Sequence, residues 1–297
     1  MQTKKKLLLT GGNGFIGRNL LASPLANKYE ISAPGRSELD LLDEDAVKDR
    51  LKNGGFDFVV HGAAKPGHRN AKEPGKVFYE STRMFFNLAR NAGYFKKMLV
   101  IGSGAIYDVR HYRPKMKEDY FDAHVPADEN GLCKYVCGKY IEKADNIIDL
   151  RVFGLYGKYE DYAIRFISNM ICKALFDLPL TMKQNRRFDY LWVEDLPPVI
   201  AHFLEIGAAH KAYNATPDKS SELLELARKV LATSGKDLPI KIAQPGLGLE
   251  YSGDNSRLKA EIKTLSFTPP DEAIRKLYAW YSANRNSINR EALLSDK

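Results

Sequence analysis

The amino-acid sequence predicts an α/β fold built on a doubly wound parallel sheet, with a smaller, interleaved α/β lobe. Short apolar runs alternate with helical patterns of about 10 to 15 residues in the first half of the chain, which is typical of βαβ units. The first apolar run ends in a glycine-rich turn, and the 297 residues allow one large α/β domain or two smaller ones.

Each element is predicted from its own pattern. Apolar and β-branched runs predict the strands, and apolar residues at helical spacing predict the helices. The predicted strands are residues 7–10, 29–32, 56–61, 97–101 and 147–153. The predicted helices are residues 15–25, 43–51, 77–92, 132–144, 163–176, 220–233 and 270–282.

The alternation of strands and helices changes after Gly157, which predicts two interleaved parts. The dinucleotide-binding part is expected at residues 1–157, with residues 186–206 returning to it. The substrate-binding lobe is expected at residues 158–185 and 207–297.

No run of 18 or more apolar residues is present, so no membrane span is expected. The basic start is too poor in apolar residues for a signal peptide, and three cysteines form no disulfide framework, so we expect a cytoplasmic protein.

A glycine loop follows the first predicted strand and opens the first predicted helix. Gly11, Gly14 and Gly17 have the spacing G-x-x-G-x-x-G. The first glycine permits the tight turn, the second lets the backbone approach a pyrophosphate, and the third allows helix and sheet to pack closely. Because a strand and a helix are predicted around the loop, the pattern indicates a dinucleotide-binding site.

The residue after the second predicted strand distinguishes the two dinucleotides. An acid at this place would bind the ribose 2′-hydroxyl of NAD, but the sequence has Arg36 in the following loop. An arginine accommodates the 2′-phosphate of NADP(H), so NADP(H) is favoured and NAD is the alternative. Arg36 as a solvated loop residue is the simpler interpretation.

A serine, a tyrosine and a lysine form the predicted catalytic group. Ser103 follows the fourth strand, at the edge where ligands meet an open parallel sheet. Tyr135 and Lys139 are four residues apart and share one face of the predicted helix. The lysine would lower the pKa of the phenol, and the tyrosine would exchange a proton with a substrate hydroxyl or carbonyl.

With these motifs in order, the sequence resembles the extended short-chain dehydrogenase/reductases, the NAD(P)-dependent nucleotide-sugar epimerase/dehydratase family. The resemblance runs from about Leu7 to Ala283. It is carried by the glycine loop, Leu39-Asp40-Leu41, residues 57–64, Ser103, Tyr135-x-x-x-Lys139, residues 151–157, Val193-Glu194-Asp195, residues 213–215 and residues 254–258. The GDP-fucose synthase branch is the most similar, through residues 36–43.

The resemblance implies a Rossmann-type fold and a role for each motif. Ser103 and Tyr135 would hold and protonate the reacting oxygen, and Lys139 would bind ribose and tune Tyr135. The implied dinucleotide-binding residues are Gly11, Asn13, Gly14, Phe15, Ile16, Gly17, Arg36, Asp40, Leu41, Ala63, Ala64, Tyr135, Lys139 and Phe153. The implied substrate-binding residues are Ser103, Gly104, Tyr135 and Arg187, with Arg187 on the pyrophosphate of a nucleotide-diphosphate sugar.

Departures from the family pattern narrow the reaction. Dehydratases of the family have an Asp-Glu pair directly after the catalytic Ser or Thr, but this chain has Gly104-Ala105. The fucose synthase branch has a cysteine where this chain has Ala105, so its double epimerisation is not expected. The arginine expected five residues before Val193 falls on Phe188, and Arg186 and Arg187 lie just before it; both could instead be solvated.

Three functions remain open. The first is an NADP(H)-dependent reductase of a nucleotide 4-keto-6-deoxysugar at C4, and the second is an NAD-dependent nucleotide-sugar 4-epimerase. The third is a non-catalytic dinucleotide-sensing or RNA-binding module, which the net charge of +8 would support. Nucleic acid is the less favoured partner, because Arg36 and the pair Arg186 and Arg187 are expected to face the phosphates of the small-molecule ligands. No metal is expected, since His61 and His68 have no ligand partner at suitable spacing. The resemblance implies a homodimer.

Overall fold

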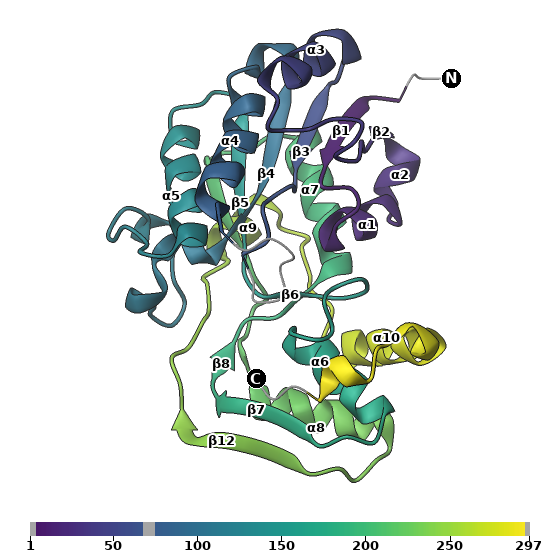
Figure 1. Cartoon of the computed structure of the whole chain (residues 1–297). Coiled ribbons are helices and arrows are strands. Elements are labelled where there is room, and N and C mark those ends of the chain that lie inside the picture. Colours follow the sequence, from purple (N-terminus) through teal and green to yellow (C-terminus); the bar gives the residue numbers. More distant parts are fainter. Residues whose placement is uncertain (1–3, 68–74, 295–297) are drawn as a thin grey trace.

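The computed structural model describes residues 4–67 and 75–294, so His68 lies outside the described residues. Its centre is a six-stranded parallel sheet (Figure 1). In spatial order the strands are β10 (Ala212–Ala215), β5 (Ile147–Val152), β4 (Lys97–Ser103), β3 (Phe58–His61), β1 (Lys6–Thr10) and β2 (Glu30–Ser32). The predicted parallel sheet is confirmed. No helix in the described ranges has the length and apolar character needed to span a bilayer.

Alternating residues along each strand pack on opposite faces of the sheet. In β1, Leu7 and Leu9 belong to one buried cluster and Leu8 to the other, as the two-residue period of a strand requires. The cluster with Leu8 is covered by α3 (Glu44–Gly54), α4 (Val77–Ala89) and α5 (Glu129–Ile141). The other is covered by α1 (Phe15–Leu21), α2 (Leu25–Lys28), α7 (Leu196–Glu205) and α9 (Ser256–Glu261). Both faces are therefore covered by helices.

Helix α5 begins earlier than its apolar pattern predicted. Its N-cap is Asp128, whose carboxylate accepts a hydrogen bond from the backbone N–H of Gly131 at 2.8 Å. An aspartate at this position satisfies an N–H that has no partner inside the helix. The first turn of α5 therefore lies at the carboxyl edge of β4, next to Ser103, where a parallel sheet binds its ligands.

A smaller lobe is attached beside the carboxyl edge of the sheet (Figure 1). Its parallel strands are β7 (Leu180–Asn185) and β12 (Ile240–Leu247), and its helices are α6 (Phe166–Leu175), α8 (Leu223–Ser234) and α10 (Pro270–Ala283). The three helices share one buried cluster, which includes Ile171, Val230 and Leu277. Short pairs join the two parts: β6 (Leu155–Tyr156) with β9 (Leu191–Trp192), and β8 (Arg187–Phe188) with β11 (Ser221–Glu222).

The chain returns to the sheet more often than the sequence predicted. Strand β10 pairs with β5, with Tyr213 opposite Leu150, although residues 207–297 were all expected in the lobe. Leu258 of α9 is also buried in the core of the sheet. The boundary at residue 207 is corrected accordingly: residues 212–215 and 256–261 belong to the sheet domain. The sequence Ala-Tyr-Asn-Ala of β10 is neither an apolar nor a β-branched run, so no strand was predicted there.

Candidate active site

Three cavities lie in series from the sheet to the smaller lobe. The first, of about 220 Å³, lies at the carboxyl ends of β1, β2 and β3 and is called here the dinucleotide pocket. Eight residues expected to bind the dinucleotide line it: Gly11, Asn13, Gly14, Arg36, Asp40, Leu41, Ala63 and Ala64. The structure thus brings together residues from three separate segments of the sequence.

The glycine loop leaves no room for side chains at two of its positions. Gly11 has φ +76°, and a Cβ there would lie 2.8 Å from the backbone nitrogen of Ala63. A Cβ on Gly17 would clash with the backbone of Gly11 and Gly12, so Gly17 lies beneath the loop and does not line the pocket. This is the close packing expected of a third glycine, and the bare backbone at Gly11 and Gly14 fits a dinucleotide.

Arg36 lies at the mouth of the dinucleotide pocket. Its Nε is 3.8 Å from the Asp40 carboxylate, and both side chains are largely exposed. An exposed pair at this distance contributes little to stability. The guanidinium is therefore held only weakly and can turn toward a phosphate in the pocket.

The second cavity, of about 660 Å³, is called here the central pocket. Ser103 lines it at the carboxyl end of β4, together with Phe15, Ile16 and Phe153. The Ser103 hydroxyl accepts a hydrogen bond from the backbone N–H of Ala105 at 3.1 Å. Gly104 is buried behind the pocket rather than lining it.

The structure does not bring Tyr135 and Lys139 to the central pocket. The Tyr135 hydroxyl donates to the Asp122 carboxylate, and Lys139 Nζ lies 2.9 Å from Asp122 and 2.9 Å from Glu142. The hydrogen bond to Asp122 raises the pKa of the Tyr135 phenol, which is opposite to the activation that the spacing predicted. The expected placement of this pair beside Ser103 is therefore corrected.

A different pair of residues on α5 faces the central pocket. Asn130 and Lys134, also four residues apart, both line it, and Lys134 Nζ donates to the carbonyl oxygen of Ile101 at 3.3 Å. A helix turns by about 100° per residue, so Tyr135 points well away from the side on which Lys134 lies. The buried Cys137 and Ile141 share the side of Asn130 and Lys134 and show which side faces the sheet. That buried stripe is the signal in the sequence that could have identified the pair.

Two tyrosines that the sequence analysis did not select also line the central pocket. Burial raises the pKa of the Tyr251 phenol, and hydrogen bonding with the nearby hydroxyls of Ser103 and Tyr112 lowers it by less. A Cβ on Gly104 would lie 2.6 Å from the Tyr251 hydroxyl oxygen, so a glycine makes room for it. Tyr112 also donates to the carbonyl oxygen of Gly104 at 3.1 Å. No local pattern marks Tyr251, because it reaches Ser103 only through the path of the chain.

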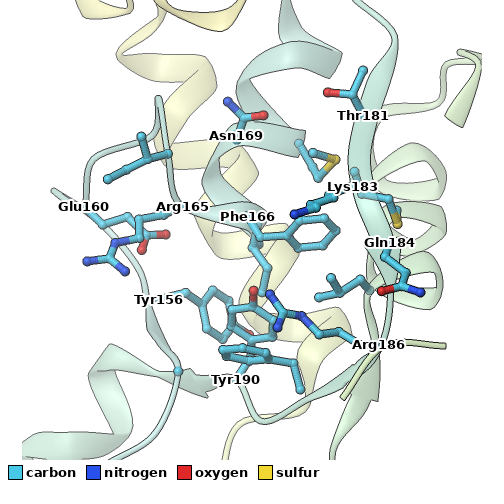
Figure 2. Close-up of a pocket in the computed structure, with 18 of the residues that line it drawn as sticks. Tyr156, Glu160, Arg165, Phe166, Asn169, Thr181, Lys183, Gln184, Arg186 and Tyr190 are labelled. Atoms are coloured by element: carbon cyan, nitrogen blue, oxygen red, sulfur yellow. The ribbon is translucent and has the colours of Figure 1, made fainter. Parts of the chain in front are cut away.

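The third cavity, of about 650 Å³, opens from the central pocket into the smaller lobe and is called here the cationic pocket. It shares Arg165 and Arg186 with the central pocket. Figure 2 shows both arginines together with Lys183 and the aromatic rings of Phe166 and Tyr190. Phe166 and Tyr190 are stacked, with ring centroids 6.3 Å apart. Positive charge beside aromatic faces is suited to an anionic ligand with a flat ring.

Arg187 is not the arginine that faces this cavity. Its guanidinium forms an ion pair with Glu222 at 3.2 Å, on the outside of β8. Arg186 lines the cavity instead, because neighbouring residues of an extended chain point in opposite directions. Arg186 and not Arg187 therefore lines this cavity, and the contact with a substrate stays a prediction.

Glu160 is the acidic residue in the wall of the cationic pocket. It is buried and accepts a hydrogen bond from the Ser168 hydroxyl, and burial raises the pKa of its carboxyl to about 8. The carboxyl is therefore mostly protonated at neutral pH, so it does not cancel the charge of Arg165, Lys183 and Arg186.

Comparison with known proteins identifies the family of this chain. A model of the NAD dependent epimerase/dehydratase family matches residues 7–216. A GDP-L-colitose synthase from Yersinia pseudotuberculosis is 30% identical over 217 residues, which are 66% of this chain and 70% of that protein. A UDP-glucose 4-epimerase from Thermotoga maritima has a similar structure, with a TM-score of 0.82, 18% identity, and 94% of this chain and 99% of that one covered. A GDP-mannoheptose C4 reductase from Campylobacter jejuni has a TM-score of 0.80 and 19% identity, covering 95% and 99%. The resemblance inferred from sequence is confirmed, and the chain belongs to the NAD dependent epimerase/dehydratase family.

Proposed function

We propose that this chain reduces the C4 carbonyl of a nucleotide-linked 4-keto-6-deoxysugar with NADPH. The order of the three cavities is the observation that carries the proposal. Ala64 is shared by the dinucleotide and central pockets, and Arg165 and Arg186 by the central and cationic pockets. A dinucleotide, a reacting sugar and a nucleoside diphosphate can therefore lie end to end, with the sugar beside Ser103.

The cationic pocket supports a nucleoside diphosphate as the anchor of the substrate. Arg165, Lys183 and Arg186 favour a pyrophosphate, and the stacked Phe166 and Tyr190 offer a surface for a base. The relative that is 30% identical is named a GDP-L-colitose synthase, which makes GDP the first nucleotide to test.

Two further features support reduction. Gly104 and Ala105 carry no group that could transfer a proton for dehydration. Arg36 at the mouth of the dinucleotide pocket provides a positive charge for the 2′-phosphate that distinguishes NADPH from NADH.

The test is to mix purified protein with a GDP-4-keto-6-deoxysugar and NADPH. One NADPH should be oxidised for each sugar reduced, and NADH should be a poorer substrate. An Arg36→Ala variant should lose most of this preference, since the added phosphate would no longer meet a positive charge. Interconversion of two sugar epimers without net oxidation of NADPH would contradict reduction and support the 4-epimerase.

A further inference from the structure

Helix α5 carries two pairs of residues with a lysine four positions after its partner. Only one of the two pairs lines the central pocket. The pair of Asn130 and Lys134 lines the central pocket with Ser103. The pair of Tyr135 and Lys139 is bound to Asp122 outside it. The pocket thus contains a lysine from α5 but no tyrosine from that helix, and an amide occupies the place one turn before the lysine.

Two phenols in the pocket come instead from other segments: that of Tyr112 from the segment after β4, and that of Tyr251 from the segment that follows β12. Tyr251 packs between Phe153, with ring centroids 4.9 Å apart, and Phe188, at 4.7 Å. It lines the pocket with Ser103, and a Cβ on the adjacent Gly104 would lie 2.6 Å from its hydroxyl oxygen. Rings on both sides fix the position of this phenol, so its hydroxyl stays beside Ser103.

We propose that Tyr251 is the proton donor in this chain and that Lys134 binds the ribose next to the nicotinamide. This inference rests on the proposed reduction. NADPH bound in the dinucleotide pocket would supply the hydride for the new C–H bond at C4 of the sugar and would become NADP⁺. The electron pair of the carbonyl π bond takes the proton from the Tyr251 hydroxyl, directly or through the Ser103 hydroxyl. The phenolate of Tyr251 then regains a proton from solvent through Tyr112.

The Tyr251 phenol carries its proton at neutral pH, as a donor must, although its raised pKa makes it a weaker acid than a free tyrosine. Burial raises the pKa of its phenol above the usual range, so it is protonated at neutral pH. Reduction of a ketone needs this protonated form, whereas oxidation of an alcohol needs the phenolate. The reverse reaction should therefore rise in rate with pH across the alkaline range, while the forward reaction stays nearly constant at neutral pH.

Matched variants test the two lysines without any sugar substrate. Lys134→Met should weaken NADPH binding by about tenfold or more, as expected for the loss of a charge-assisted hydrogen bond. Lys139→Met removes the same group from the same helix and should leave the affinity unchanged. The measurement is a fluorescence titration of NADPH, and an effect of Lys139→Met alone would overturn the assignment.

The two tyrosines are compared in the same way. Tyr251→Phe should lower single-turnover reduction by about 10² to 10³-fold at unchanged NADPH affinity, which is typical of a lost general acid. Tyr135→Phe should have no effect. In the Tyr251→Phe background, Asn130→Tyr should restore activity, because the new phenol would lie one turn before Lys134. A loss of activity in Tyr135→Phe, or full activity of Tyr251→Phe, would overturn the proposal.

A fluorine label separates this proposal from the proposed function. Fluorotyrosine placed at position 251 should shift its ¹⁹F signal when NADP⁺ binds, and the same label at position 135 should not. This result requires no turnover. If the wild-type protein reduces no 4-ketosugar but the label at 251 responds, only the function is wrong. If the label at 135 responds instead, the assignment of the residues is wrong.

Discussion

At the scale of a single residue, the protonation state of Glu160 changes the net charge in the wall of the cationic pocket. Burial raises the pKa of its carboxyl to about 8, so the folded protein holds a proton there that the unfolded chain releases near its usual pKa of 4.5. The stability from this proton is fully present below about pH 4.5 and is lost as the pH rises through about 8.

Glu160→Gln should therefore reduce the fall in the free energy of unfolding between pH 5 and 8, by an amount on the order of a few kcal/mol. Asp189 also has a raised pKa, of about 6, and would cause the dependence that remains. Urea unfolding across this pH range measures the effect. Glu30→Gln, on the exposed side of β2, serves as the control, and equal pH profiles of Glu160→Gln and wild type would contradict the assignment.

The pairs Tyr135–Lys139 and Arg186–Arg187 show the limit of reasoning from residue types. In both cases the sequence contains the right chemistry within a few residues of the right place. The residue that faces the cavity depends on the rotation of α5 and on the direction of one extended residue. A shift by one residue moves a side chain by about 100° on a helix and to the opposite face on a strand.

At the scale of an element, helix α3 illustrates how local signals position the dinucleotide pocket. The Asp43 carboxylate accepts hydrogen bonds from the backbone N–H groups of Asp45 at 3.1 Å and Ala46 at 3.0 Å. The helix then buries Val47 and Leu51 against the sheet. Its start follows directly after the segment that contains Asp40, so the cap helps to hold that segment in place.

Asp43→Ala should lower the free energy of unfolding by about 1 kcal/mol, because two N–H groups lose their acceptor. Urea denaturation measures the change, with the slope of the transition unaltered. Lys48→Ala, on the exposed face of the same helix, should change stability by much less. A loss at Asp43 no larger than the loss at Lys48 would show that the cap is not needed.

The prediction of elements succeeded where periodicity was long. All five predicted strands and the helices around them are present, because apolar periods of two and 3.6 residues reflect which faces are buried. Strand β10 was missed because its four residues carry no distinctive pattern and pair with β5 only after the chain has passed through the smaller lobe.

At the scale of the whole molecule, the two proposed ligands would occupy separate cavities that join at the central pocket. The dinucleotide pocket lies on the sheet, and the cationic pocket lies between α6 and β7. A ligand that binds only the folded state stabilises it by about 2.7 kcal/mol at 100 times its Kd. The cationic residues that line these cavities account for part of the net charge of +8, so this charge does not require a nucleic acid partner. The homodimer stays a prediction.

NADP⁺ and GDP should each raise the melting temperature, and their effects should add when both are present. Arg186→Ala should remove most of the shift caused by GDP and leave the shift caused by NADP⁺, because Arg186 lines only the cationic and central pockets. Arg187→Ala should keep both shifts, since that side chain is paired with Glu222. Differential scanning fluorimetry measures all three proteins, and loss of the GDP shift in Arg187→Ala alone would contradict the assignment.

The sequence by itself determined the parallel sheet, the glycine loop and the position of Ser103. These features depend on local periods and on residue types that only one backbone geometry accommodates. Only the tertiary structure decided that Lys134 rather than Lys139 lines the pocket and that Tyr251 meets Ser103. The packing of Cys137 and Ile141 on the sheet sets the rotation of α5, and a long path through the smaller lobe brings Tyr251 to β4. Such contacts join residues far apart in the chain, so no local pattern records them.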